Sequence, residues 1–226
     1  HGRGMGQWGS YGYATKYGWS AAQILEHFYG GTTAGTIDPA TTIAVVLTDR
    51  DDAASVDLVQ PGGRLLTSAA AGQRFAALRT VEVAPNSWDV YSAPAAACGQ
   101  TDPAAWTKLT VAGPVAGPVT FGVEGAAVDT TDVPASLIGV CQSDGRTRSY
   151  RGDMFVANDP ADGSNHVVNV LPMEQYLRGV VPRESPASWG DAAGGKGIEA
   201  LKAQAVAARS YAKADVRSSY ARFHAQ

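Results

Sequence analysis

One carboxyl group in the C-terminal part of the sequence has the surroundings of a candidate general acid. Glu184 lies between Pro182 and Pro186 in the run VVPRESP, and Trp189 follows shortly after. A partly desolvated carboxyl group of this kind has a raised pKa and can donate a proton, whereas nearby cations lower that pKa again. The residues alone leave the balance between these two effects open.

Two cations that could act with this carboxyl group follow it in the sequence. Lys202 and Arg209 are seven residues apart, so on a helix they project within about 20° of each other. Val206 lies between them, and an unpaired charge on a partly apolar face would be costly. The structural alternative to a catalytic role is therefore an ion pair between Glu184 and one of these two cations.

The helix that must position these cations is predicted over residues 198–214. This stretch contains no Pro or Gly and consists mainly of strong helix formers, and several glycines precede it. Its apolar residues leave no wide polar side, which predicts a central helix rather than a surface helix. Ahead of Glu184, Pro172 suits the first turn of another helix. Before that helix, two β-branched runs on either side of DPADGSN predict a hairpin.

Three runs between Tyr150 and Ala212 carry a family pattern: YRGDMFVAN, VVNVLPMEQYLRGVVPRESPASWG and EALKAQAVAARSYA. Together they resemble the SpoIID/LytB family of bacterial sporulation and cell-wall proteins. The resemblance implies a lytic transglycosylase that cuts the glycan strands of peptidoglycan, preferring strands stripped of stem peptides, without a metal or other cofactor. It places the catalytic acid on Glu184 and the functionally important lysine and arginine on Lys202 and Arg209.

The chain departs from the family pattern at two places near the acid. Ser185 stands where the family usually has Met, and the insertion GDAAGGKGI separates Trp189 from Glu199. Neither departure removes a chemical group, although the insertion can reshape the rim of the cleft. We expect Trp189, and Gln204 within the AQAVAAR run, to contact the substrate.

The N-terminal stretch HGRGMGQWGSYGYA contains a formal G-x-G-x-x-G at Gly4, Gly6 and Gly9. No strand precedes it and Trp8 would occupy the turn, so a dinucleotide site is rejected. After this stretch, Ser20 is a candidate N-cap for a short helix that glycines terminate.

The same N-terminal stretch resembles the family segment G-H-G-x-G-M-S-Q-x-G-A, which in better-known members follows the acid rather than preceding it. We expect this segment to pack beside the Glu184 block, because sequence order does not decide spatial adjacency. The residues expected to line the cleft are His1, Arg3, Met5 and Gln7. The structural alternatives are a disordered terminus for His1 and a loop-stabilising amide for Gln7.

The two cysteines, Cys98 and Cys141, have no Cys or His neighbours at zinc-binding spacing, so we expect no metal site. A disulfide between them would close a loop of about 43 residues and contribute about 4 kcal/mol on the chain-entropy estimate. Such a bond is typical of an extracytoplasmic protein, in the bacterial cell wall or secreted. Two free buried thiols are the alternative.

Short β-branched and aromatic runs separated by turn residues occupy residues 36–148. We predict an α+β fold in which residues 1–35 and 149–226 form a SpoIID-like core with a central Ala-rich helix and a β-hairpin. Residues 36–148 would be an inserted all-β domain, a sandwich or a barrel. The aromatic side chains Trp88, Tyr91 and Trp106 could stack on sugars there, but strand aromatics more often belong to a core.

The composition of this chain of 226 residues argues against two classes of partner. A net charge of −3 gives no electrostatic case for binding nucleic acid or an anionic membrane, and no apolar run approaches the roughly 18 residues of a membrane span. No signal peptide is recognised. We expect a mature or trimmed fragment with a truncated C-terminus, because family segments such as S-S-S-x-G-G do not follow the AAR helix.

Two functional alternatives accompany the lytic transglycosylase. One is a non-catalytic glycan-binding module or amidase enhancer, whose partners would be peptidoglycan glycan strands and other cell-wall hydrolases. The other is a hydrolase, which needs a second carboxyl group about 5 to 9.5 Å from the first. Its candidates are Asp191, Glu174 and Glu199. A lytic enzyme needs only one carboxyl group, because the substrate supplies the nucleophile.

Overall fold

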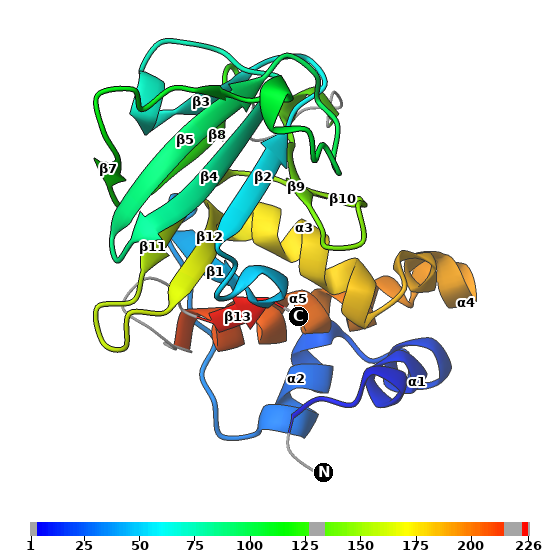
Figure 1. Ribbon diagram of the computed structural model, residues 1–226. Coiled ribbons are helices and arrows are strands. Elements are labelled where there is room, and N and C mark those ends of the chain that lie inside the picture. Colours follow the sequence, from blue (N-terminus) through cyan, green and yellow to red (C-terminus); the bar gives the residue numbers. More distant parts are fainter. Residues whose placement is uncertain (1–3, 127–133, 215–222, 226) are drawn as a thin grey trace. The chain divides into compact units, whose positions relative to one another are not determined.

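The computed structural model describes residues 4–126, 134–214 and 223–225 of the chain and has the predicted α+β fold (Figure 1). The chain divides into two compact units. The helical unit comprises residues 1–41 and 172–215, and the β unit comprises residues 42–171 and 216–226. Within the described residues, no helix has the length and apolar character that a membrane crossing requires.

The helical unit is organised around α5, which contacts α1, α2 and α3. The predicted helix over residues 198–214 is confirmed by the bounds of α5. It is less buried than its composition suggests, because Ala200, Ala203 and Ala212 are buried while Val206 is 40% exposed. The helices of this unit are α1 (Gln7–Tyr17), α2 (Ala21–Tyr29), α3 (Met173–Glu184), α4 (Ala192–Gly195), α5 (Ile198–Ala214) and the 3-10 helix η5 (Ala187–Asp191).

Local sequence signals explain where these helices begin and end. Ser20 caps α2 as predicted, because its hydroxyl accepts from the Gln23 backbone N–H while the Gln23 side chain accepts from the Ser20 N–H. α1 ends at Gly18, whose φ of 69° is a left-handed conformation that glycine adopts without strain. The core of the unit is small and contains Ala14, Ile24, Ala200 and Ala203.

The β unit consists of two sheets (Figure 1). The first has the strand order β13-β1-β12-β11-β8-β3, and the second has the order β10-β9-β2-β4-β5-β6, with β7 pairing to β5. The strands of the first sheet are β1 (Thr42–Leu47), β3 (Leu65–Thr67), β8 (Val119–Val123), β11 (Asp153–Asn158), β12 (Asn165–Pro172) and β13 (Phe223–Ala225). Those of the second are β2 (Ser55–Val59), β4 (Ala77–Ala84), β5 (Ser87–Ala93), β6 (Thr107–Lys108), β7 (Val115–Ala116), β9 (Ile138–Cys141) and β10 (Thr147–Tyr150). Short 3-10 helices also occur in the described part of this unit: η1 (Thr48–Arg50), η2 (Ser68–Ala70), η3 (Pro103–Ala105) and η4 (Pro134–Ser136).

The two sheets share one core, as in a sandwich. Alternate residues of β8 are buried, as expected for a strand with one face on a core, and residues from both sheets join the same apolar cluster. Trp88 on β5 is fully buried in this cluster. Of the two readings for Trp88, the core reading is therefore correct, and this side chain is not available to stack on a sugar.

The predicted hairpin forms and belongs to the same sheet as part of residues 36–148. β11 pairs antiparallel with β12 and also with β8, so the two segments fold together. The compact units divide at residues 41/42 and 171/172. The predicted boundaries lie at 35/36 and 148/149, and the insertion of residues 36–148 into a family core stays a prediction.

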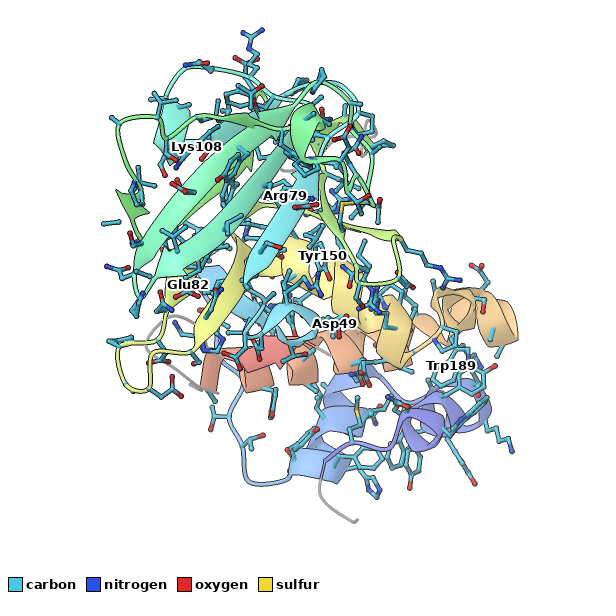
Figure 2. All side chains as sticks on the ribbon, viewed as in Figure 1. Asp49, Arg79, Glu82, Lys108, Tyr150 and Trp189 are labelled. Atoms are coloured by element: carbon cyan, nitrogen blue, oxygen red, sulfur yellow. A yellow bond between two sulfur atoms is a disulfide. The ribbon has the colours of Figure 1, made fainter. Side chains whose placement is uncertain are left out.

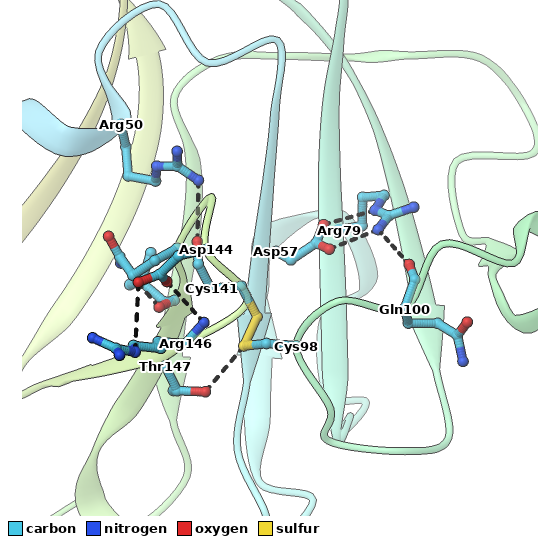
Figure 3. The surroundings of a disulfide bond; sticks show 11 residues. Arg50, Asp57, Arg79, Cys98, Gln100, Cys141, Asp144, Arg146 and Thr147 are labelled. Atoms are coloured by element: carbon cyan, nitrogen blue, oxygen red, sulfur yellow. Dashed lines mark hydrogen bonds and ion pairs between the residues drawn. A yellow bond between two sulfur atoms is a disulfide. The ribbon is translucent and has the colours of Figure 1, made fainter.

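The predicted disulfide between Cys98 and Cys141 is present and joins the loop after β5 to β9 (Figure 3). Beside it, Arg79 donates two hydrogen bonds to the Asp57 carboxylate, at 2.7 and 2.6 Å. The Arg79 guanidinium also lies 4.2 Å from the centre of the Trp106 ring. This contact engages Trp106 within the β unit.

Candidate functional site

Glu184 is the last residue of α3, and its side chain is exposed. The helix ends there because Ser185 precedes Pro186 and is extended, with φ −138° and ψ 117°. Ser185 rather than Glu184 points inward: it is buried, and its hydroxyl has no hydrogen-bond partner among the described residues. The partly desolvated setting expected for the Glu184 carboxyl group is therefore not observed.

The hydrogen-bond partner of Glu184 comes from the opposite end of the sequence. The Gln7 side-chain amide, at the start of α1, donates to Glu184 Oε2 at 2.6 Å. The structure thus brings Gln7 to the acid. Met5 is partly buried against the helical core, and its backbone N–H donates to Tyr29 Oη at 3.0 Å. His1 and Arg3, expected to line the same cleft, lie outside the described residues.

Lys202 binds a different carboxylate from the one considered in the sequence. Its Nζ lies 2.6 Å from Glu199 Oε1, one turn earlier on α5. The second oxygen of Glu199 accepts the Ala21 backbone N–H at 2.8 Å, at the start of α2. The Lys202 hydrogen bond, followed by the Ala21 hydrogen bond, lowers the pKa of Glu199 against the opposing effect of desolvation. Glu199 therefore ties α5 to the positive end of α2.

Arg209 binds Glu174 in the first turn of α3, at the opposite end of this helix from Glu184. It makes a bidentate contact with the Glu174 carboxylate, with N–O distances of 2.8 to 3.0 Å. Glu174 and Glu184 are ten residues apart on this helix, which corresponds to about 15 Å along its axis. The alternative of an ion pair between Glu184 and Lys202 or Arg209 is not observed among the described residues, where each cation pairs with another carboxylate.

Tyr176 is a neighbour of Glu184 that the sequence analysis missed. It lies half-buried on α3, eight residues before the acid, which corresponds to about 12 Å along the helix axis. Burial raises the pKa of Tyr176 far above its ordinary value, and the Glu184 carboxylate and Tyr211 raise it further. Tyr176 thus stays protonated within electrostatic reach of the acid.

Aromatic side chains surround the segment that follows Glu184. Trp189, labelled in Figure 2, lies in η5. The centroid of its ring is 4.9 Å from that of Trp8 and 4.5 Å from that of Tyr11. Trp189 is 8% exposed, whereas Trp8 is 73% exposed. Sequence analysis singled out Trp189 but not Trp8 or Tyr11. Gln204, the other expected substrate contact, is half-buried on α5.

At Glu184 the arrangement offers an exposed carboxylate with an amide donor, Gln7. Of the three candidate second carboxyl groups, Glu174 and Glu199 are engaged by Arg209 and Lys202, and Asp191 is exposed at the end of η5. The part of the chain that the structure describes contains no group of three or more His, Cys, Asp or Glu placed to hold a metal ion. The geometry fits proton transfer by a single carboxyl group.

Comparison with known proteins gives one family and one relative. Residues 161–226 match the family model SpoIID, described as stage II sporulation protein, and this segment contains Glu184, Lys202 and Arg209. An uncharacterized protein of Brachyspira hyodysenteriae is 44% identical over 63 residues, which cover 28% of this chain and 14% of the relative. No solved structure matches. Residues 161–226 are thus similar to the SpoIID family, and the chain spans only a small part of the length of the relative that it matches.

Proposed function

We propose that this chain is a lytic transglycosylase that cleaves the bond between MurNAc and GlcNAc in peptidoglycan, prefers peptide-free strands and leaves 1,6-anhydroMurNAc ends. The observation that carries the proposal is the exposed Glu184 carboxylate held by Gln7, within the segment that matches the SpoIID family. With the Cys98–Cys141 disulfide, this function fits an extracytoplasmic location.

In the proposed reaction Glu184 serves as acid and then as base. The protonated carboxyl group donates to the glycosidic oxygen, and the C1–O bond breaks. The carboxylate then takes the proton of the C6 hydroxyl, whose oxygen bonds to C1 of the same sugar. The Gln7 hydrogen bond fixes Oε2, which leaves Oε1 to carry the proton toward the substrate. No external nucleophile is consumed.

Lys202 and Arg209 act in this proposal as positioning residues. Through Glu199, Lys202 helps to hold α5 against α2. Through Glu174, Arg209 holds α5 against α3, the helix that ends in the acid. Both therefore fix the frame that carries Glu184 and Gln7, rather than contacting the acid.

A non-catalytic glycan-binding module or amidase enhancer is the second candidate. The exposure of Glu184 favours it, because the carboxyl group lies open to water rather than in the water-excluded site that is typical of catalysis. Such a protein would bind glycan strands and increase the turnover of a separate cell-wall amidase without releasing sugar fragments of its own.

Product analysis separates these functions. Purified peptidoglycan and peptide-free glycan strands would be incubated with the wild-type chain, with Glu184→Gln and with Glu26→Gln, which makes the same change at an exposed position of α2. Mass spectrometry should detect anhydro-ended fragments from the wild type and the Glu26 variant but not from the Glu184 variant.

Other products would indicate a function other than that of a lytic transglycosylase. Reducing ends would indicate a hydrolase. The absence of fragments together with retained glycan binding would indicate a binding module, and stimulation of an added amidase would then identify the enhancer.

A further inference from the structure

Three aromatic rings form a cluster at the start of α1. Trp189 is buried and Tyr11 is half-buried, whereas Trp8 contacts both at an angle and has most of its surface exposed. The Trp8 and Tyr11 rings meet edge to face at 6.0 Å, as expected for positions i and i+3 of one helix. Two well-supported rings thus fix a third ring that faces water.

An exposed indole fixed in this way requires an explanation. Burying Trp8 in the small helical core would remove apolar surface from water, yet the ring is held outside that core by its neighbours. Large exposed apolar groups that are held rigid are typical of binding surfaces, because little side-chain entropy is lost when a ligand arrives.

Trp8 and Trp189 are both close in the sequence to the residues of the Gln7–Glu184 hydrogen bond. Trp8 directly follows Gln7, whose amide donates to Glu184. Trp189 follows Glu184 by five residues and lies in η5, the first element after the end of α3. A ligand that lies on the Trp8 ring is therefore adjacent to the residues that present the carboxyl group.

The chemistry of the surface favours a sugar ring. A flat indole face binds a ligand that is apolar on one side and polar at its edges, as the C–H face and equatorial hydroxyl and acetamido groups of a pyranose are. The side chains of Trp8, Tyr11 and Trp189 carry no charge, and the Glu184 carboxylate would repel phosphates. Nucleic acid is therefore a poor candidate for the ligand.

We propose that Trp8, supported by Tyr11 and Trp189, is a stacking subsite for one N-acetylhexosamine ring of a β-1,4-linked glycan. This inference rests on the proposed function for the identity of the ligand. The subsite binds a sugar next to the residue that meets Glu184, so it determines how many sugars a strand must have in order to bind well. It adds affinity for the strand but takes no part in proton transfer.

The test measures binding separately from cleavage. Titration calorimetry with a β-1,4-linked N-acetylglucosamine tetramer would be carried out on the full chain with Glu184→Gln, alone and combined with Trp8→Ala, Trp8→Tyr or Tyr17→Ala. Tyr17 is the matched control, because it is an aromatic residue of the same helix that is 71% exposed. Circular dichroism melting would check that all variants fold.

We expect Trp8→Ala to weaken binding by about tenfold or more, while Trp8→Tyr stays within about threefold of the parent and Tyr17→Ala has no effect. Unchanged binding in Trp8→Ala, an equal loss in Tyr17→Ala, or no binding of the tetramer by the parent would each overturn the subsite.

Cleavage assays keep the two proposals apart. If wild type releases anhydro ends and Trp8→Ala does so with an unchanged KM, the subsite is wrong and the enzyme assignment stands. If Trp8→Ala loses binding but wild type releases no fragments, the subsite stands and the chain is a binding module.

Discussion

The two units of this protein are packed in different ways. The β unit buries large side chains such as Trp88, Leu58 and Met154, and the two sheets share a single core. In the helical unit the buried cluster consists mostly of alanines, and the aromatic residues packed against this cluster are partly buried. Large buried side chains thus form the core of the β unit, whereas small ones form the core cluster of the unit that carries the acid.

The disulfide and ion pairs that stabilise the two units also differ. The β unit contains a disulfide and a largely buried Arg79–Asp57 pair. The helical unit relies on the Glu199–Lys202 and Glu174–Arg209 pairs, each with at least one exposed partner, and such pairs typically contribute under about 1 kcal/mol. We therefore expect substitutions in the helical unit to change activity more than stability, and substitutions in the β unit to do the reverse.

The largest expected effect is on activity. Glu184→Gln should reduce the release of anhydro ends by about 10²- to 10⁴-fold, the range typical for loss of a general acid. Its thermal midpoint should stay close to that of wild type, because the side chain is exposed and glutamine can still accept from Gln7. A comparable loss of activity in Glu26→Gln would show that the effect is not specific to this acid.

Removal of the disulfide should give the largest loss of stability. In Cys98→Ser combined with Cys141→Ser, the free energy of unfolding should fall by about 4 kcal/mol, because the unfolded chain regains the freedom of a long loop. Chemical denaturation would measure this change, and cleavage assays below the midpoint should show nearly unchanged activity. An equal loss of activity under native conditions would contradict the separation between the two units.

Loss of the bidentate contact between α3 and α5 should have a moderate effect. Arg209→Lys cannot make the paired hydrogen bonds to Glu174, so we expect a loss of about 0.5–1 kcal/mol in stability. If Arg209 is a positioning residue, kcat should fall several-fold while KM changes little. Glu174→Gln should give the same change, and the double variant should add little to either one. Fully additive effects would argue against action through Glu174.

The smallest expected effect is a pH dependence that originates at Glu199. Its pKa in the folded state is lowered, so its contribution to stability is present above its ordinary pKa of about 4.3 and is lost as pH falls toward the folded value. Denaturation measured between neutral and acidic pH should show a shallower decline in Glu199→Gln than in wild type. An identical pH slope in the two proteins would contradict this assignment.

Local features of the sequence predicted the elements well. The run of helix formers over residues 198–214 gave the bounds of α5, Ser20 gave the cap of α2, and the disulfide followed from two isolated cysteines. These features depend on neighbours in the sequence, or on a pairing with no competitor. Propensity and periodicity suffice for such cases.

The choice of partners at the site was not predictable in this way. Glu184, Glu174 and Glu199 compete for two cations, and the outcome depends on how α3 and α5 pack. The exposure of Glu184 and the position of Trp8 likewise depend on tertiary contacts. The family resemblance brought Gln7 toward the acid in the prediction, but residue patterns alone could not identify the hydrogen bond between them.

The division of the helical unit between two distant segments affects the order of events during synthesis. The N-terminal helices are made first. Ile24 of α2, however, is buried partly by Ala200 and Ala203 of α5, and residues 30–197 must be made in between. At about 5–20 residues per second the 168 residues between α2 and α5 take roughly 8 to 34 seconds, during which the aromatic residues of α1 and α2 lack the cover of α5. The nascent chain therefore exposes these aromatic residues until α5 has been made, and the Gln7–Glu184 hydrogen bond cannot form until most of the chain has been translated.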